Sequence, residues 1–222
     1  MYAQVDLGLP SGLLWAETNL DIGRNVIRIP DSEKSEMDLA WEDAWGMGIE
    51  EWEYLFSGEK AGVNGTFLDW GDGHTVAPFD CLPDLCTTYR KSVETLKAEG
   101  VVDSRGRLTR SYDVVSRCLG GKWRLPTRED WLELIRECRW EYRSTDKFRG
   151  YVVYGPNGNS ISLPMAGYYH GGKIKGEYGN YWSSTVSEND KTAYSCELGL
   201  EGPKMYQNLR YFGFSVRGVT ER

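Results

Sequence analysis

Histidines and closely spaced cysteine pairs are sparse in this chain, which limits the enzymatic chemistry it can support. Its only histidines are His74 and His170, and none of its cysteines forms a Cys-x-x-Cys pair. A zinc site or a Cys–His catalytic pair is therefore not expected. We predict a protein that is not an enzyme, with no catalytic residues and no cofactor. The thiols are interpreted as reduced and mostly buried, although a Cys81–Cys86 bridge stays open: Cys81, Cys86, Cys118, Cys138 and Cys196.

One short segment has the residue types of a metal loop. Asp69-Trp-Gly-Asp-Gly-His74 offers the oxygen ligands of Asp69 and Asp72. It lacks the rest of an EF-hand pattern. We favour a glycine-rich turn with acidic residues, and no metal site is predicted.

Aromatic and amide side chains recur along the C-terminal third of the chain. Paratopes use such residues, because tyrosine supplies rigid contact area and polar groups supply adaptable hydrogen bonds. The alternative is that these tyrosines merely cover a sheet. We predict that the following residues form one exposed ligand-binding patch: Tyr169, His170, Asn180, Tyr194, Tyr206, Asn208 and Tyr211. Tyr194 is its weakest member, because alternation places it with Cys196 and Leu198 unless a bulge lies near Ser195.

The overall charge and hydropathy exclude several kinds of partner. The formal net charge is −7, whereas nucleic acids and anionic membranes attract basic surfaces. No apolar run approaches the length of a membrane span. Met1–Leu9 lacks the basic start and apolar stretch of a signal peptide. We expect the partner to be a protein or a surface ligand, and we expect no nucleic-acid binding and no membrane insertion. The identity of the ligand, the oligomeric state and the localisation are left open.

The order of the elements that would position these residues predicts an α+β protein, with helices first and a strand-rich C-terminal half. Thr127-x-x-Asp130 forms a capping box that begins a helix, with Trp131 on the face that packs on a sheet. Two other helices are expected over Pro83–Glu99 and Ser111–Leu119. Strands are expected in these segments: Val5–Leu20 as strand, turn and strand, then Tyr151–Tyr154, Ser160–Leu163, Met165–Tyr169, Tyr181–Ser184, Ala193–Leu200 and Phe212–Val219.

The segment from Met37 to Phe56 is acidic and rich in tryptophan. Trp41, Trp45 and Trp52 recur at helical spacing, which favours a helix that packs on the domain. A partner-binding surface is the alternative, since tryptophan is enriched at hot spots.

Four motifs occur in an order that resembles one known family. They are Val5-Asp-Leu-Gly-Leu-Pro-Ser-Gly-Leu-Leu-Trp-Ala16, Gly120-Gly-Lys-Trp-Arg-Leu-Pro-Thr-Arg-Glu-Asp-Trp131, Gly155-Pro-Asn-Gly-Asn-Ser160, and Tyr181-Trp-Ser-Ser184 followed by Gly213-Phe-Ser-Val-Arg217. The order resembles the major paralogous domain named after Fibrobacter succinogenes, which is common in Bacteroides-type bacteria and their phages. That family is similar to the C-type lectin fold. The resemblance implies a single C-type-lectin-like domain over residues 1–222, with residues 28–106 as a large insertion. It also implies that the N- and C-terminal strands, within Val5–Ala16 and Phe212–Val219, lie close together.

The resemblance implies a receptor-type or adhesin-type binding protein on a phage virion or a cell surface. The C-terminal layout is also similar to the variable proteins of diversity-generating retroelements, which display hypervariable residues on a fixed lectin-fold scaffold. Their randomised asparagine codons yield Tyr, His and Asn but not Lys, Glu, Gln or Met. Every residue of the predicted patch is thus eligible, and these neighbours are not: Glu177, Lys191, Glu197, Lys204, Met205 and Gln207. Whether a retroelement diversified this segment stays open.

Two further resemblances suggest alternatives. Calcium-dependent lectins carry Trp-Asn-Asp where this chain has Trp182-Ser-Ser184, and serine hydroxyls are weak substitutes for the charged oxygens that calcium prefers. We therefore expect folding without calcium and a core position for Trp182. The Trp-Arg-Leu-Pro-Thr segment is similar to the formylglycine-generating-enzyme superfamily, which needs a late cysteine pair, and only Cys196 lies there. A structural assembly module is the remaining alternative.

Overall fold

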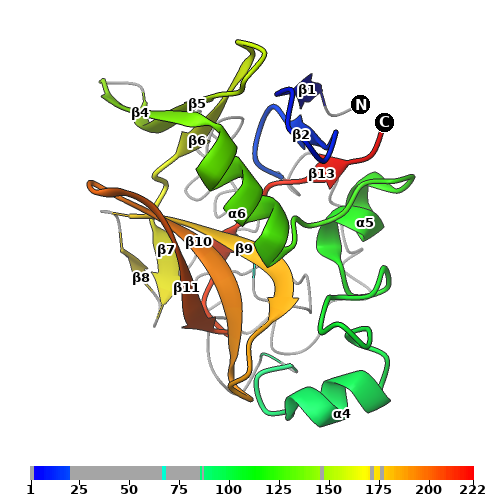
Figure 1. Ribbon diagram of the computed structural model, residues 1–222. Helices are drawn as coiled ribbons and strands as arrows, with labels where there is room; N and C mark the ends of the chain where they lie inside the picture. The colour runs from blue at the N-terminus through cyan, green and yellow to red at the C-terminus, as the bar shows by residue number, and fades with distance from the viewer. Residues whose placement is uncertain are drawn as a thin grey trace, which may run out of the picture.

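The computed structural model describes residues 3–20, 67–68, 86, 88–145, 148–170, 173–175 and 178–222, with 67–68, 169–170 and 173–175 described by their backbone alone. Its helices and strands confirm the expected α+β class (Figure 1). The described helices are α4 (Val93–Ala98), α5 (Val114–Leu119) and α6 (Arg128–Glu137). The described strands are β1 (Gln4–Asp6), β2 (Leu14–Ala16), β3 (Phe67–Leu68), β4 (Arg139–Ser144), β5 (Arg149–Tyr154), β6 (Ser160–Pro164), β7 (Tyr168–His170), β8 (Lys173–Lys175), β9 (Gly179–Val186), β10 (Thr192–Gly199), β11 (Gly202–Leu209), β12 (Phe214–Ser215) and β13 (Val219–Thr220).

A five-stranded sheet in the order β11-β10-β9-β12-β3 carries α6 on one face (Figure 1). The predicted capping box is confirmed, because Thr127 accepts a hydrogen bond from the Asp130 amide and Asp130 accepts one from the Thr127 amide. Trp131 is fully buried and its indole N–H donates to the Trp182 carbonyl at 3.3 Å. The helix is thus anchored to the sheet by the residue that the sequence indicated.

The two ends of the chain meet in a three-stranded sheet in the order β1-β2-β13. Val219 pairs with Trp15, so the expected proximity of the N- and C-terminal strands is confirmed. Buried Arg217, just before β13, donates to the carbonyls of Ala16 and Ser162 at 2.8 and 2.7 Å. This guanidinium joins β2 to β6, and its burial lowers its pKa to about 10.

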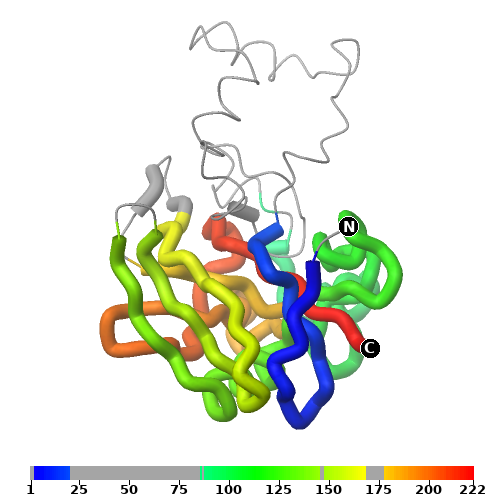
Figure 2. The backbone as a smooth tube through the Cα atoms, turned by 90° about the horizontal axis from the view of Figure 1, so that it is seen from above, coloured from blue at the N-terminus to red at the C-terminus, as the bar shows by residue number. Residues whose placement is uncertain are grey.

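A third sheet contains β4, β5 and β6, and its predicted β5–β6 hairpin is confirmed. The hairpin loop lies against the N-terminal hairpin (Figure 2), where Asn157 and Asn159 both donate to the Asp6 carbonyl at 2.8 Å. A Cβ atom on Gly155 would lie only 2.0 Å from the Leu7 carbonyl oxygen. Glycine at position 155 therefore permits the close approach of the two hairpins.

Two groups of buried side chains form the core on the two sides of the large sheet. One surrounds Trp131 and Tyr181 on the α6 side. The other surrounds Trp182, which is buried as expected and stacks on Phe214 with 4.2 Å between ring centroids. Leu96 and Val101 belong to this second group. The predicted insertion at 28–106 therefore contributes to the core through its described part.

Several boundaries differ from the sequence-based expectations. Helix α4 begins at Val93 instead of Pro83, because Ser92 accepts the Thr95 amide as its N-cap and residues 88–90 form a turn. The strand expected over Phe212–Val219 is divided into β12 and β13, and β4 and β11 were not predicted as strands. The tryptophan-rich segment at 37–56, the loop at 69–74 and Cys81 lie outside the described residues.

Candidate functional site

Strand β11 forms one edge of the large sheet and presents part of the predicted patch. It pairs with β10 in unbroken antiparallel register, with Lys204 opposite Glu197 and Tyr206 opposite Ser195. Directly opposed residues share a face, and so do alternate residues of one strand. Four side chains therefore lie on one face at the sheet edge, and we call them the edge surface: Glu197, Lys204, Tyr206 and Asn208.

The edge surface combines an exposed aromatic ring with fixed polar groups. Tyr206 keeps 44% of its surface exposed. Asn208 is half-buried, and its amide donates to the Ser195 hydroxyl at 2.8 Å. Burial raises the pKa of Glu197, and the nearby Lys204 opposes this shift. The arrangement offers a ring, an amide and charges of both signs on a paired strand.

Tyr194 does not belong to this surface, so the prediction of one patch is wrong for it. Its partner across β10–β11 is Gln207, which places it on the opposite face from Tyr206. The β9–β10 register does shift between Ala193 and Ser195. Tyr194 nevertheless lies over α6, where its hydroxyl donates to Glu188 at 2.8 Å and Arg128 sits 4.6 Å from its ring centroid.

The expectation of exposure is wrong for Asn180 and Tyr211, which are 2% and 9% exposed. Asn180 lies opposite Glu197 in the β9–β10 pair, and its strand β9 has β10 on one side and β12 on the other. Tyr211 packs edge-to-face on Tyr89, with 4.8 Å between ring centroids. Both were expected to be exposed in the predicted patch, but long-range packing buries them.

Tyr169 and His170 lie in β7, which pairs with β8. A bridge between Gly167 and Gly179 brings the start of β7 to the start of β9. A role for Tyr169 and His170 in binding stays a prediction.

Two exposed residues near the edge surface were missed at the sequence level. Tyr178 precedes β9 and Leu200 lies in the β10–β11 turn, and both are exposed. The Tyr178 ring lies 3.6 Å from where a Cβ on Gly199 would be, so these residues flank the same turn. A strand over Ala193–Leu200 would place the Leu200 side chain on the same apolar face as Cys196 and Leu198. In the structure β10 ends at Gly199, so Leu200 lies in the turn and is exposed.

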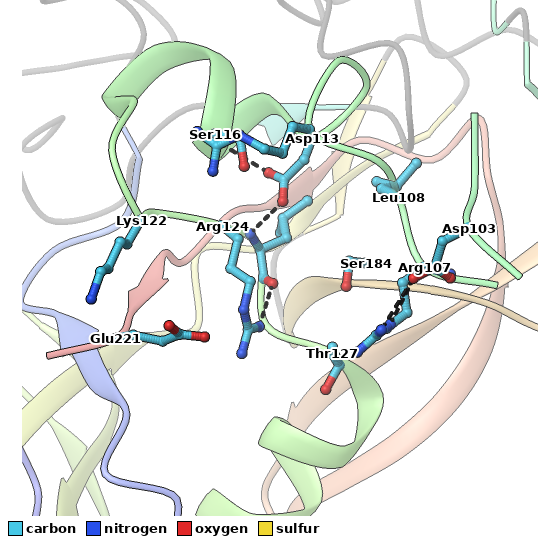
Figure 3. A pocket seen from close by; sticks show the side chains of 12 residues that line it. Asp103, Arg107, Leu108, Asp113, Ser116, Lys122, Arg124, Thr127, Ser184 and Glu221 are labelled. Atoms are coloured by element: carbon cyan, nitrogen blue, oxygen red, sulfur yellow. Dashed lines mark hydrogen bonds and ion pairs between the residues drawn. The ribbon is translucent and has the colours of Figure 1, made fainter. Parts of the chain in front are cut away.

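A separate polar cavity of about 330 Å³ lies where the N-terminus of α5, the start of α6 and β9 meet (Figure 3). Its walls are the following residues: Asp103, Arg107, Leu108, Arg110, Asp113, Ser116, Lys122, Arg124, Leu125, Thr127, Ser184 and Glu221. None of the predicted patch residues lines it.

Within the described ranges, no group of three or more His, Cys, Asp or Glu side chains is arranged to hold a metal ion. Burial strongly raises the pKa of the Cys196 thiol, which disfavours its reactive thiolate form. In the part of the chain that the structure describes, no helix has the length and apolar character needed to cross a membrane.

Comparison with known proteins gives no assignment. No protein-family model, curated protein or solved structure matches this chain. Its function therefore has to be inferred from its own residues and their geometry.

Proposed function

We propose that this chain is a C-type-lectin-like binding domain that contacts a protein or surface ligand through the edge surface. The observation that carries the proposal is the exposed Tyr206 ring, flanked by Lys204 and Asn208 on a strand paired along its whole length. Tyrosine is enriched at hot spots because it buries a large apolar ring and keeps a polar hydroxyl. A rigid strand also reduces the entropy lost when such side chains become ordered on binding.

The lectin-like part of the proposal is supported by the arrangement of the motifs. The first motif contributes β2, which pairs with β13 beyond the last motif, and Trp131 of the second motif contacts both Trp15 and Tyr181. All four motifs thus support one scaffold rather than a catalytic centre. The edge surface lies on β10 and β11, between the two parts of the fourth motif. These are C-terminal strands, where the resemblance implies a binding surface.

Diversification by a retroelement is an additional part of this proposal. Tyr206 and Asn208 are eligible products of randomised asparagine codons, whereas Lys204 and Glu197 beside them are not. The resulting surface would combine two variable positions with two fixed charged ones. The neighbouring DNA tests this idea, since it should contain a near-repeat of the codons for Tyr168–Val219 beside a reverse transcriptase gene. Absence of such a repeat would leave a binding protein with a fixed surface.

Two alternatives have less support. A formylglycine-generating type of enzyme needs a reactive cysteine pair, whereas Cys196 is fully buried with a raised thiol pKa. A structural assembly module would bury the edge surface against another subunit, and this alternative predicts self-association instead of binding to a foreign partner.

The proposal is tested by comparing Tyr206→Ala with two control variants. The probe is a panel of purified surface proteins from Bacteroides-type bacteria, screened by biolayer interferometry. For a protein that the native chain binds, Tyr206→Ala should weaken affinity by about 2 kcal/mol, or roughly thirtyfold, with an unchanged melting temperature. Tyr142→Ala should change neither quantity, because Tyr142 is also exposed but lies on β4.

The third variant separates binding from folding. Tyr211→Ala should lower the melting temperature, because Tyr211 is buried against Tyr89. Equal losses of affinity in Tyr206→Ala and Tyr142→Ala, or a marked fall in the melting temperature of Tyr206→Ala, would contradict the proposal. Concentration-dependent self-association that Tyr206→Ala abolishes would favour the assembly module.

A further inference from the structure

The hydroxyl group of a buried serine residue lines the polar cavity. Ser184 is only 3% exposed, and its backbone is fully used: its amide donates to the Pro126 carbonyl and its carbonyl accepts the Leu108 amide. Among the described residues, no hydrogen-bond partner is found for its side-chain hydroxyl, which lines the cavity (Figure 3). A hydroxyl group that faces a cavity in this way is available to donate to a polar atom of a bound molecule.

The cations around the cavity are only partly neutralised. Arg107 pairs with Asp103 at 3.1 Å, and Arg124 pairs with Asp130 at 2.6 Å through one of its nitrogens. By contrast, Arg110 donates to the neutral carbonyl of Gly121, whereas Lys122 donates to a main-chain oxygen of Arg222. Arg110 forms no ion pair with a carboxylate in the described part of the chain. Its positive charge therefore remains available at the cavity.

Two of the acidic residues in the walls have their oxygens engaged within the protein. Asp113 accepts the backbone amides of Val115, Ser116 and Leu125. Its burial raises the pKa of its carboxyl group, and these hydrogen bonds oppose that shift. Both oxygens of Asp103 are taken up by the turn at 103–107, through hydrogen bonds from Arg105 and Arg107. Glu221 is the remaining acid in the walls, and it is exposed.

We infer that this cavity binds a small molecule through an oxyanion group, a carboxylate or a phosphate. The Ser184 hydroxyl donates to one oxygen, the free N–H groups of Arg107 and Arg124 approach from the sides, and Arg110 supplies charge at the rim. Such charge-assisted hydrogen bonds are stronger than neutral ones. The volume lies at the lower end of the range for small-molecule sites, so the group belongs to a compact polar molecule. This site is separate from the edge surface and does not depend on its role.

The direct test is an NMR titration of the full chain with inorganic phosphate and, separately, with citrate, while amide shifts are followed at constant ionic strength. We expect saturable shifts at the amides of Leu108, Leu125 and Ser184. Saturation with phosphate alone would identify a phosphate site, and saturation with citrate alone a carboxylate site; either result supports the inference. Absence of saturable shifts with both probes would overturn it, and would leave solvent as the partner of Ser184.

Two substitutions test whether the cavity itself is the binding site. Ser184→Ala removes one hydroxyl and should weaken binding about tenfold, the effect typical of a hydrogen bond to a charged group. Arg107→Gln should weaken it at least as much, whereas Arg105→Gln removes the same charge from the same turn outside the cavity walls and should have little effect. Equal effects of the two arginine variants would indicate non-specific attraction and refute the site. If Arg107→Gln does not fold, an unchanged affinity of Ser184→Ala for the probe would by itself refute the proposed site.

Discussion

The rings of Trp15 and Trp131 pack edge-to-face, with 4.9 Å between their centroids. Trp15 lies in β2, near the N-terminus, and Trp131 lies in α6. Both side chains are fully buried. This contact joins the sheet that holds the two ends of the chain to the helix that covers the large sheet, so both tryptophans have a structural role.

Replacing Trp131 with alanine should destabilise the protein by about 3–5 kcal/mol. The substitution leaves a large cavity and removes the indole donor from the Trp182 carbonyl. Urea denaturation followed by circular dichroism measures the change. Arg136→Ala, at an exposed position of the same helix, should stay within about 0.5 kcal/mol of the native chain. Similar losses in both variants would show that packing of the Trp131 ring is not what determines the effect.

Asp113→Ala should cost about 3 kcal/mol of stability, because one carboxylate caps α5 and also binds the Leu125 amide. Asp113→Asn should cost less, since its carbonyl oxygen can still cap the helix while its NH₂ group faces the Leu125 N–H. Thermal unfolding of both variants tests this order. If alanine and asparagine are equally harmful, the cap is not what stabilises this region.

The stability contributed by Asp113 should also depend on pH. Burial raises its pKa above the ordinary value of about 3.9, so the native state binds this proton more tightly than the unfolded chain does. The contribution is fully present below the unfolded pKa and is lost as pH rises through the folded pKa. The stability advantage of the native chain over Asp113→Asn should therefore shrink on going from about pH 4 to pH 7. Denaturation curves at several pH values measure it, and an advantage that grows with pH would contradict the shift.

Alkylation should label the described cysteines in the order of their exposure. Cys118 is exposed, whereas Cys138 is half-buried and has its pKa raised to about 11 by burial and by Glu133 and Glu137. Cys86 and Cys196 are buried. In the native state, iodoacetamide should modify Cys118 first and Cys138 slowly, and should reach Cys86 and Cys196 only on unfolding. Peptide mass spectrometry reads the order, which would be refuted by early labelling of Cys196.

Calcium removal should leave the melting temperature unchanged. The expectation rests on Trp182-Ser-Ser184, where hydroxyl groups occupy the positions of the calcium-binding side chains of calcium-dependent lectins. A ligand that binds only the native state must stabilise it, so a required ion would reveal itself in a melt with chelator. A drop of several degrees on adding EDTA, reversed by excess calcium, would disprove the expectation.

Elements whose signals are local could be predicted from the sequence alone. The capping box of Thr127 and Asp130 fixes the start of α6, because both hydrogen bonds join residues within one turn. The loop from Gly155 to Asn159 likewise fixes the β5–β6 hairpin. The family-like order of motifs also indicated that the two ends of the chain pair, as β2 and β13 do.

Which side chains reach the surface depends on tertiary packing and could not be predicted from the sequence. Asn180 and Tyr211 have the residue types of a paratope, yet neighbouring elements bury both, and strand register separates Tyr194 from Tyr206. The polar cavity is a product of assembly alone, because Arg107, Ser184 and Glu221 are far apart in sequence and no local pattern connects them. Hydrogen bonds within a turn or hairpin can be read from neighbouring residues, whereas burial depends on which distant segments pack together.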